Sequence, residues 1–300
     1  MTGSSDSNYF LNKALEFPSP AKINLFLHIV GQREDGYHHL ETLFQFIDHS
    51  DTLTLKVTET PDIKLLTPIN GVSNEDNLIV KAARLLKNKT NTLFGVEISI
   101  DKILPMGSGL GGGSSNAATI LVALNTLWHC KLSLDELAVL GLTLGADVPI
   151  FVHGFSAFAQ GVGEQLTAME PLQSWYLITK PECSISTQKI FTAKELPRKT
   201  KRLSLTDLKT KDFITDQFHN DCQTLVIKHY PEVAKLLAWL VEYAPSRMTG
   251  TGACIFTRLS SQEEAYSLQA KLPKGISSFV AQGLNKSPLA SVIANLSLGK

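Results

Sequence analysis

The sequence has few cysteines, no net charge and no long hydrophobic run, and each shortage excludes a class of protein. Lysine plus arginine and aspartate plus glutamate both number 28, and no long basic run offers a nucleic-acid surface. No apolar run approaches the roughly 18 residues of a membrane span. Zinc sites and disulfide frameworks are not expected, because no C-x-x-C spacing occurs among Cys130, Cys183, Cys222 and Cys254. We therefore expect a cytoplasmic protein without nucleic-acid or membrane partners.

The chain is large enough for two cores. It has 300 residues, of which 43% are hydrophobic. Its first eight residues are polar and lack the regions of a signal peptide, which also favours the cytoplasm. The residue pattern changes after about Gly163, and a charged sequence typical of loops follows. We predict two α+β domains, residues 1–160 and 161–300.

Periodicity predicts the elements around a glycine-rich segment. Residues 96–101 alternate as a strand does, and 114–128 have apolar residues at helical spacing. A capping box of Ser133 and Glu136 opens a further helix. Other strands are predicted at 23–30, 52–57, 150–160, 176–179 and 254–256, a helix at 77–86 and an amphipathic segment at 233–243. A second glycine turn lies at 249–253.

The glycine-rich segment is the most distinctive stretch. Five of the seven residues from Gly107 to Gly113 are glycine, which accepts positive φ and lets a ligand approach the main chain. Before a helix, such a loop directs N–H groups and the positive end of the helix dipole at one point. The segment predicts a phosphate site. The hydroxyl of Ser114 or Ser115 either caps the helix or faces the phosphate.

Three familiar phosphate loops fit this segment poorly. Gly107, Gly109 and Gly112 match G-x-G-x-x-G, but the acidic residue expected about 20 positions later would fall at a helix start, on Asp135 or Glu136. No lysine follows the last glycine, as a Walker A loop requires. The protein-kinase motifs are missing from the sequence as well. The phosphate site is of another type.

Three polar residues stand in apolar surroundings. Lys22 and Asn24 are two positions apart in a predicted strand and so share a face. A lysine there is often a surface residue, yet the convergence of two polar groups favours a site. Asp147 lies among small and apolar residues, and a buried carboxylate needs a partner. A Lys–Asp pair beside a phosphate loop suits phosphoryl transfer, with lysine offsetting charge and aspartate receiving or orienting the hydroxyl proton.

Three separated segments, 18–24, 105–118 and 249–253, resemble the motifs of the GHMP kinase superfamily of small-molecule kinases. Segments 31–38, 141–149 and 245–252 narrow this resemblance to members whose alcohol substrate carries a cytidine diphosphate. The likeness runs from about residue 18 to 289. It implies an α+β, two-domain fold, with an ATP-binding N-terminal domain like ribosomal protein S5 domain 2 and a ferredoxin-like substrate domain.

The resemblance implies ATP as phosphoryl donor, Mg²⁺ as cofactor and transfer to the 2-hydroxyl of that alcohol, in isoprenoid synthesis. Lys22 and Asp147 match the catalytic pair. Asp147 acts either as a base or as an electrostatic guide. The positions implied to bind ATP are Asn77, Lys102, Pro105, Met106, Gly107, Ser108, Gly109, Leu110, Gly111, Gly112, Gly113, Ser114 and Ser115.

The resemblance also implies a substrate site for cytosine. Tyr37 and Phe191 match aromatic residues that stack on the base, and His38 matches the residue that reads its edge. Asn24 and Thr187 match further substrate contacts. In a kinase for homoserine or a mevalonate derivative, the first three would have no shared role. A nucleotide-binding relative without activity is a further alternative, which retention of the catalytic pair disfavours.

The sequence departs from the family pattern in two respects. Ser108 stands where the family commonly has glycine or alanine, which adds a hydroxyl to the loop. No acidic residue is evident as the Mg²⁺ ligand, so the metal ligands stay unassigned, and phosphate oxygens and water are the expected donors. A monomer and a homodimer are both compatible with the sequence.

Overall fold

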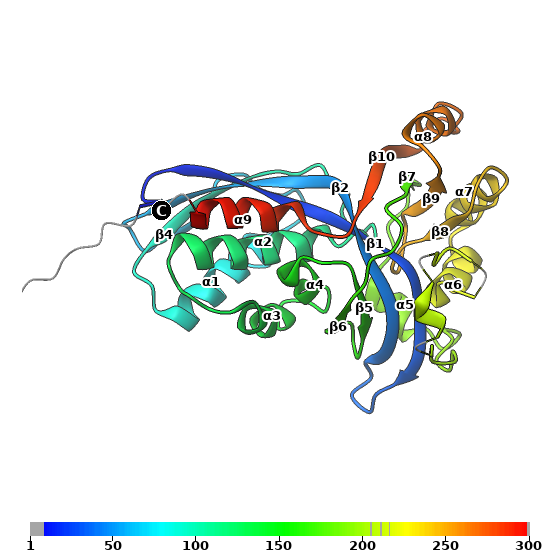
Figure 1. Ribbon diagram of the computed structural model, residues 1–300, viewed down its shortest axis with the longest axis horizontal. Coiled ribbons are helices and arrows are strands. Elements are labelled where there is room, and N and C mark those ends of the chain that lie inside the picture. The colour runs from blue at the N-terminus through cyan, green and yellow to red at the C-terminus, as the bar shows by residue number, and fades with distance from the viewer. Residues whose placement is uncertain (1–8, 205, 211, 216, 299–300) are drawn as a thin grey trace, which may run out of the picture.

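A long antiparallel hairpin runs through both halves of the molecule (Figure 1). Its strands are β1 (Ala14–Gln32) and β2 (His38–Thr58). The computed structural model describes residues 9–204, 206–210, 212–215 and 217–298, so the polar start at 1–8 lies outside the described residues. Because the apolar residues of both strands are buried along most of their length, the hairpin contributes to every core of the protein.

The first half places a layer of helices on one face of the sheet (Figure 1). Here β2 pairs with β4 (Gly95–Asp101), which pairs in parallel with β3 (Ile63–Leu65). The helices are α1 (Leu78–Thr90), α2 (Gly112–Leu127), α3 (Leu134–Leu142) and α4 (Val148–His153). Helix α2 is buried around most of its surface, which explains its almost wholly apolar and small-residue sequence.

The second half continues the sheet in the order β2-β10-β7-β9-β8. Its strands are β7 (Trp175–Lys180), β8 (Ser246–Met248), β9 (Ile255–Leu259) and β10 (Ser277–Leu284). Its helices are α5 (Thr187–Thr192), α6 (Asp221–His229), α7 (Pro231–Val241) and α8 (Gln262–Gln269), with a 3₁₀ turn η1 (Asp207–Lys209). A short hairpin of β5 (Ala157–Gln160) and β6 (Gln165–Ala168) adds to β2 between the halves.

The last helix, α9 (Pro288–Leu298), returns to the first half (Figure 1). Its Leu289 belongs to the core that α2 and β4 build, so the chain ends against the half in which it began. The division at residue 160 stays a prediction. The predicted α+β class is confirmed, and no described helix is long and apolar enough to cross a bilayer.

The local predictions succeed where side chains signal a boundary. The capping box of Ser133 and Glu136 is present, with both reciprocal hydrogen bonds. The strand predicted at 150–160 is wrong in its first part, because α4 occupies 148–153 with a proline in its first turn and only 157–160 is extended. Of the two roles left open for the Ser114 or Ser115 hydroxyl, the helix cap is not observed, because α2 begins after Gly111 without a side-chain cap.

Candidate active site

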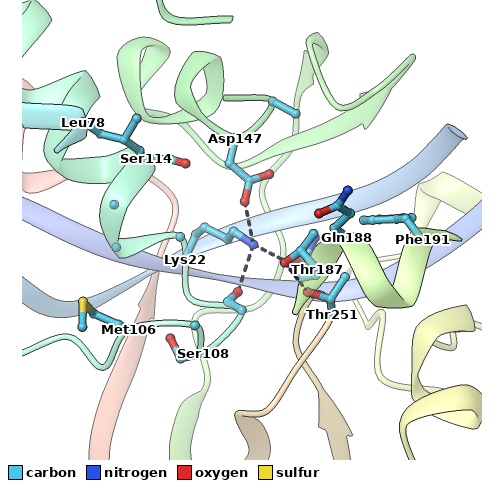
Figure 2. A pocket seen from close by; sticks show the side chains of 18 of the residues that line it. Lys22, Leu78, Met106, Ser108, Ser114, Asp147, Thr187, Gln188, Phe191 and Thr251 are labelled. Carbon is cyan, nitrogen blue, oxygen red and sulfur yellow. Dashed lines mark hydrogen bonds and ion pairs between the residues drawn. The ribbon is translucent and has the colours of Figure 1, made fainter. Parts of the chain in front are cut away.

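A cleft of about 1090 Å³ lies along the hairpin, between the glycine-rich loop and α5. Strand β1, the loop at 105–111, the segment before α4 and the turn at 249–252 all contribute to its walls. Figure 2 shows side chains from these separate parts of the chain pointing toward one another. Residues far apart in sequence therefore form one site.

Main-chain and hydroxyl hydrogen bonds hold the three motif segments together. The Lys22 N–H of β1 donates to the Leu110 carbonyl in the glycine loop, at 3.0 Å. The next inward-facing residue, Asn24, donates its N–H to Thr249 Oγ1 at 2.9 Å. Thr249 Oγ1 in turn donates to the Gly109 carbonyl at 3.2 Å. Strand, loop and turn are thus fixed relative to one another without any ligand.

Lys22 lies at the centre of the cleft and Asp147 faces it (Figure 2). The Lys22 Nζ is 3.3 Å from Asp147 Oδ2, 2.6 Å from Asn24 Oδ1 and 3.0 Å from the Gly109 carbonyl. The lysine side chain is 3% exposed and the aspartate side chain 36%. Asp147 stands at the N-cap of α4 but caps no N–H there. Its carboxylate therefore faces the cleft, where an acceptor hydroxyl could reach it.

The glycine loop brings its main chain close to other backbone. Gly109 has φ +78°, and a Cβ there would lie 2.2 Å from the Thr249 carbonyl oxygen. Gly111, with φ +74°, is the N-cap of α2, and a Cβ there would lie 2.8 Å from the Phe151 ring. Only glycine fits these positions. Since no side chain caps α2, its first N–H groups are available to an anion.

A buried network of charged and polar groups, which the sequence analysis missed, supports the glycine-rich loop. Asp51 of β2 is fully buried and accepts from Lys102 Nζ at 2.7 Å and from the Ile103 and Leu104 N–H groups at 2.9 and 2.8 Å. Asn116 of α2 donates to the same carboxylate at 2.9 Å. The strand, the loop entrance and the helix start are therefore joined through one carboxylate.

The opposite wall carries aromatic and hydroxyl side chains. His38 stacks on Phe191 of α5, with ring centroids 5.4 Å apart and planes inclined by 28°. Tyr37, in the turn of the hairpin, is 64% exposed. The hydroxyls of Thr187 and Thr251 lie 2.9 Å apart (Figure 2). Burial, and then the nearby guanidinium of Arg198, lower the pKa of His38, so its ring is neutral near pH 7.

The structure brings nearly all of the predicted site residues to this one cleft. Both members of the predicted catalytic pair line it, as do all five predicted substrate residues, Asn24, Tyr37, His38, Thr187 and Phe191. Of the predicted ATP residues, Asn77, Lys102, Pro105, Met106, Gly107, Ser108, Gly109, Gly111, Gly112, Gly113 and Ser114 line it too.

Leu110 and Ser115 are the exceptions. Leu110 is fully buried in a hydrophobic cluster, and its carbonyl binds β1. Ser115 is also buried, and its Oγ accepts from Ser19 at 2.9 Å. Both side chains thus face the protein interior, and at Leu110 only the main chain serves the loop.

Asn77 lines the cleft with an unused donor. Its Oδ1 caps α1 by accepting from the Ile79 N–H at 3.0 Å. Its Nδ2 is buried and has no hydrogen-bond partner among the described residues. A buried amide donor without a partner is costly, which indicates that a ligand or water completes it.

Other site residues carried no clear signal in the sequence. Thr251 lies in the glycine turn that the sequence analysis singled out, although no role was assigned to it. Arg198 stands in a charged loop and donates from Nε to His38 Nε2 at 3.1 Å. Within the described residues, no group of three His, Cys, Asp or Glu side chains could hold a metal ion.

Comparison with known proteins places these features in a family. The family model described as "GHMP kinases N terminal domain" matches residues 77–155, and "GHMP kinases C terminal" matches 209–277. A 4-diphosphocytidyl-2-C-methyl-D-erythritol kinase of Colwellia psychrerythraea is 80% identical over 300 residues, covering 100% of both chains. One of Shewanella pealeana is 57% identical over 92% of this chain and 96% of its own.

Solved structures agree on the fold. A crystal structure of 4-(cytidine 5'-diphospho)-2C-methyl-D-erythritol kinase has a TM-score of 0.77 at 28% identity, covering 90% of this chain and 99% of its own. A mevalonate kinase has a TM-score of 0.65 at 18% identity, over 91% of this chain and 100% of its own. A homoserine kinase has a TM-score of 0.63 at 16% identity, over 96% and 98%. At such low identity the last two share the fold alone.

Proposed function

This chain belongs to the 4-diphosphocytidyl-2-C-methyl-D-erythritol kinases of the GHMP kinase family, and from that premise we propose how its residues act. It transfers the γ-phosphate of ATP to the 2-hydroxyl of 4-diphosphocytidyl-2-C-methyl-D-erythritol, a step of the non-mevalonate isoprenoid pathway, and releases ADP. The contact of Lys22 with Asp147 beside the glycine loop carries the proposal for the catalytic pair.

The loop and α2 hold the phosphates of ATP. The loop's main chain and the uncapped start of α2 offer N–H donors to phosphate oxygens, where glycine keeps the approach open. Asn77 Nδ2, a buried donor, supports a nucleotide contact at the same end of the cleft. Lys102 acts on this wall through Asp51, because its ammonium is already bonded there.

Lys22 and Asp147 act on the transferred group. The buried ammonium of Lys22 stabilises negative charge that develops on the phosphoryl oxygens. Asp147 orients the acceptor hydroxyl and receives its proton, for which its partly exposed carboxylate is suitably open. Because phosphoryl transfer has a loose transition state, positioning contributes more than proton removal.

The acceptor is chosen at the other wall. Tyr37 and Phe191 offer ring faces for cytosine, and His38 offers polar atoms for its edge. Asn24 and Thr187 contact the sugar alcohol, between the base and the catalytic pair. A homoserine or mevalonate acceptor would leave these aromatic residues without a partner.

We propose that Mg²⁺ accompanies ATP. Asp147 and Ser114 line the same part of the cleft, and their oxygen atoms suit a hard cation (Figure 2). With so few carboxylates at hand, phosphate oxygens and water would complete the coordination. The ion supplies charge compensation for the phosphates.

For the working form, a monomer and a homodimer both remain compatible with the proposal. The four cysteines are free thiols, which supports a reducing, cytoplasmic setting.

Turnover with defined acceptors tests the proposal. The purified protein is incubated with Mg-ATP and the cytidyl substrate, and ADP and the 2-phosphate are measured, with homoserine and mevalonate as control acceptors. We expect product from the cytidyl substrate alone. Turnover of a control acceptor in its place would contradict the proposal.

A further inference from the structure

The guanidinium of Arg198 lies beside His38, on the wall of the cleft that we propose binds cytosine, and several hydrogen bonds hold it in place. It follows α5 and donates to three carbonyls: from Nη2 to Ala193 at 2.7 Å, and from Nη1 to Lys194 and Leu196 at 3.2 and 3.0 Å. Its remaining Nε–H donates to His38 Nε2 at 3.1 Å. Hydrogen bonds to main-chain carbonyls therefore fix the planar guanidinium independently of its contact with His38.

This hydrogen bond determines where the His38 proton lies. An arginine has only donors and keeps its charge in proteins, so Nε2 of His38 must be the acceptor. A neutral imidazole with an acceptor at Nε2 carries its proton at Nδ1. His38 lines the cleft, and no described residue forms a hydrogen bond with its Nδ1. The Nδ1–H is therefore available to a ligand.

The surroundings favour the neutral ring. Burial and the positive charge of Arg198 both lower the pKa of His38. The other charged groups on neighbouring elements are exposed or paired elsewhere: Arg33 with Asp35, Glu41 with Arg202 and the Leu203 N–H, Glu195 with Lys228 and His229, and exposed Lys189 and Lys194 on and after α5.

We propose that Arg198 is a positioning residue that selects the Nδ1–H tautomer of His38, so that the histidine presents a fixed donor to an acceptor atom on the substrate's base. The inference rests on the proposed function in one respect, the contact of His38 with cytosine. Because neutral cytosine offers acceptors at O2 and N3, a fixed donor matches that edge. The same arginine also ties α5, which carries Phe191, to the histidine.

The first experiment reads the tautomer without substrate. Long-range ¹H–¹⁵N correlation spectra of the ¹⁵N-histidine-labelled protein, with His38→Gln used for assignment, distinguish the two ring nitrogens. We expect a protonated Nδ1 and an unprotonated Nε2 at pH 7.5 in the wild type. A protonated Nε2 would overturn the proposal, whatever the enzyme phosphorylates.

The second experiment removes the guanidinium. In Arg198→Met the neutral ring is free to take either tautomer. At pH 8 we expect the KM for the cytidyl substrate to rise about three- to tenfold, with kcat and the KM for ATP little changed. As the pH falls through the pKa of His38, which burial still holds below its ordinary value in this variant, the KM should return toward the wild-type value, because an imidazolium donates from both nitrogens.

A purely structural role for Arg198 would raise the KM equally at every pH, and that result would refute the proposal. Arg202→Met is the matched control, since Arg202 ties the same segment to β2 through Glu41, at 3.2 Å, without touching His38. It should show no such pH-dependent KM. If the wild type does not turn over the cytidyl substrate, the proposed function fails, while the spectra still decide the tautomer.

Discussion

The two walls of the cleft are built on different principles. The phosphate wall rests on a fully buried carboxylate, Asp51, with Lys102, Asn116 and two main-chain N–H groups bonded to it. The acceptor wall combines buried His38 and Thr251 with the half-buried ring of Phe191 and with Tyr37, which is 64% exposed. ATP is common to the whole family, so its wall can be rigid and integral to the core. The proposed acceptor wall includes the exposed ring of Tyr37, where a substitution disturbs the fold little.

The largest effect on catalysis is expected for Lys22 and Asp147, the proposed catalytic pair between the two walls. Lys22→Ala and Asp147→Asn should each lower kcat by at least about 10²-fold, because charge stabilisation and hydroxyl positioning are lost. Single-turnover kinetics at saturating ATP and cytidyl substrate measure this. A near-normal rate in either variant would remove that residue from the mechanism.

Next in size is a substitution within the loop. Gly109→Ala places a Cβ 2.2 Å from the Thr249 carbonyl at φ +78°, and the strain and overlap together cost about 2–5 kcal/mol. We expect weaker ATP binding by at least about tenfold. Gly36→Ala is the control on the acceptor wall, since its φ is +88° and no atom lies within 4 Å of the added Cβ. Equal ATP affinities in the two variants would contradict the close approach.

The buried network should affect stability as well as ATP binding. Asp51→Asn leaves the Lys102 ammonium without its counter-charge, and breaking such a pair costs about 3–5 kcal/mol. Denaturant unfolding should show this loss, and the KM for ATP should rise. Glu97→Gln, which breaks the more exposed pair of Lys56 and Glu97 at 3.4 Å, should cost no more than about 1 kcal/mol. Equal stability of the two variants would contradict a supporting role of the buried Asp51 network beneath the phosphate wall.

The smallest effect on the fold is expected at the acceptor wall. Tyr37→Ala should raise the KM for the cytidyl substrate about five- to tenfold, as loss of a stacking partner does. Its unfolding free energy and its KM for ATP should stay near wild type, since the ring is largely exposed. Steady-state kinetics with each substrate varied in turn provide the comparison. A parallel rise in both KM values would argue against stacking on the base.

Sequence periodicity predicted the strand, loop and helix order and the shared face of Lys22 and Asn24, because these depend on neighbours within a few residues. It failed at Val148 to His153, where an apolar run with two valines reads equally well as a strand or a short helix. The proline in the first turn and the glycine after His153 were the signals that could have separated the two.

The sequence by itself determined the glycine loop, the polar residues in apolar surroundings and, through its motifs, the family. Only the tertiary structure decided that Asp51 binds the loop entrance, that Leu110 and Ser115 face inward, and that Arg198 donates a hydrogen bond to His38. The physical reason is separation along the chain. Asp51 lies 51 residues from Lys102, and Arg198 lies 160 residues from His38. Local propensity carries no information about such contacts, which the packing of the hairpin and its neighbours creates.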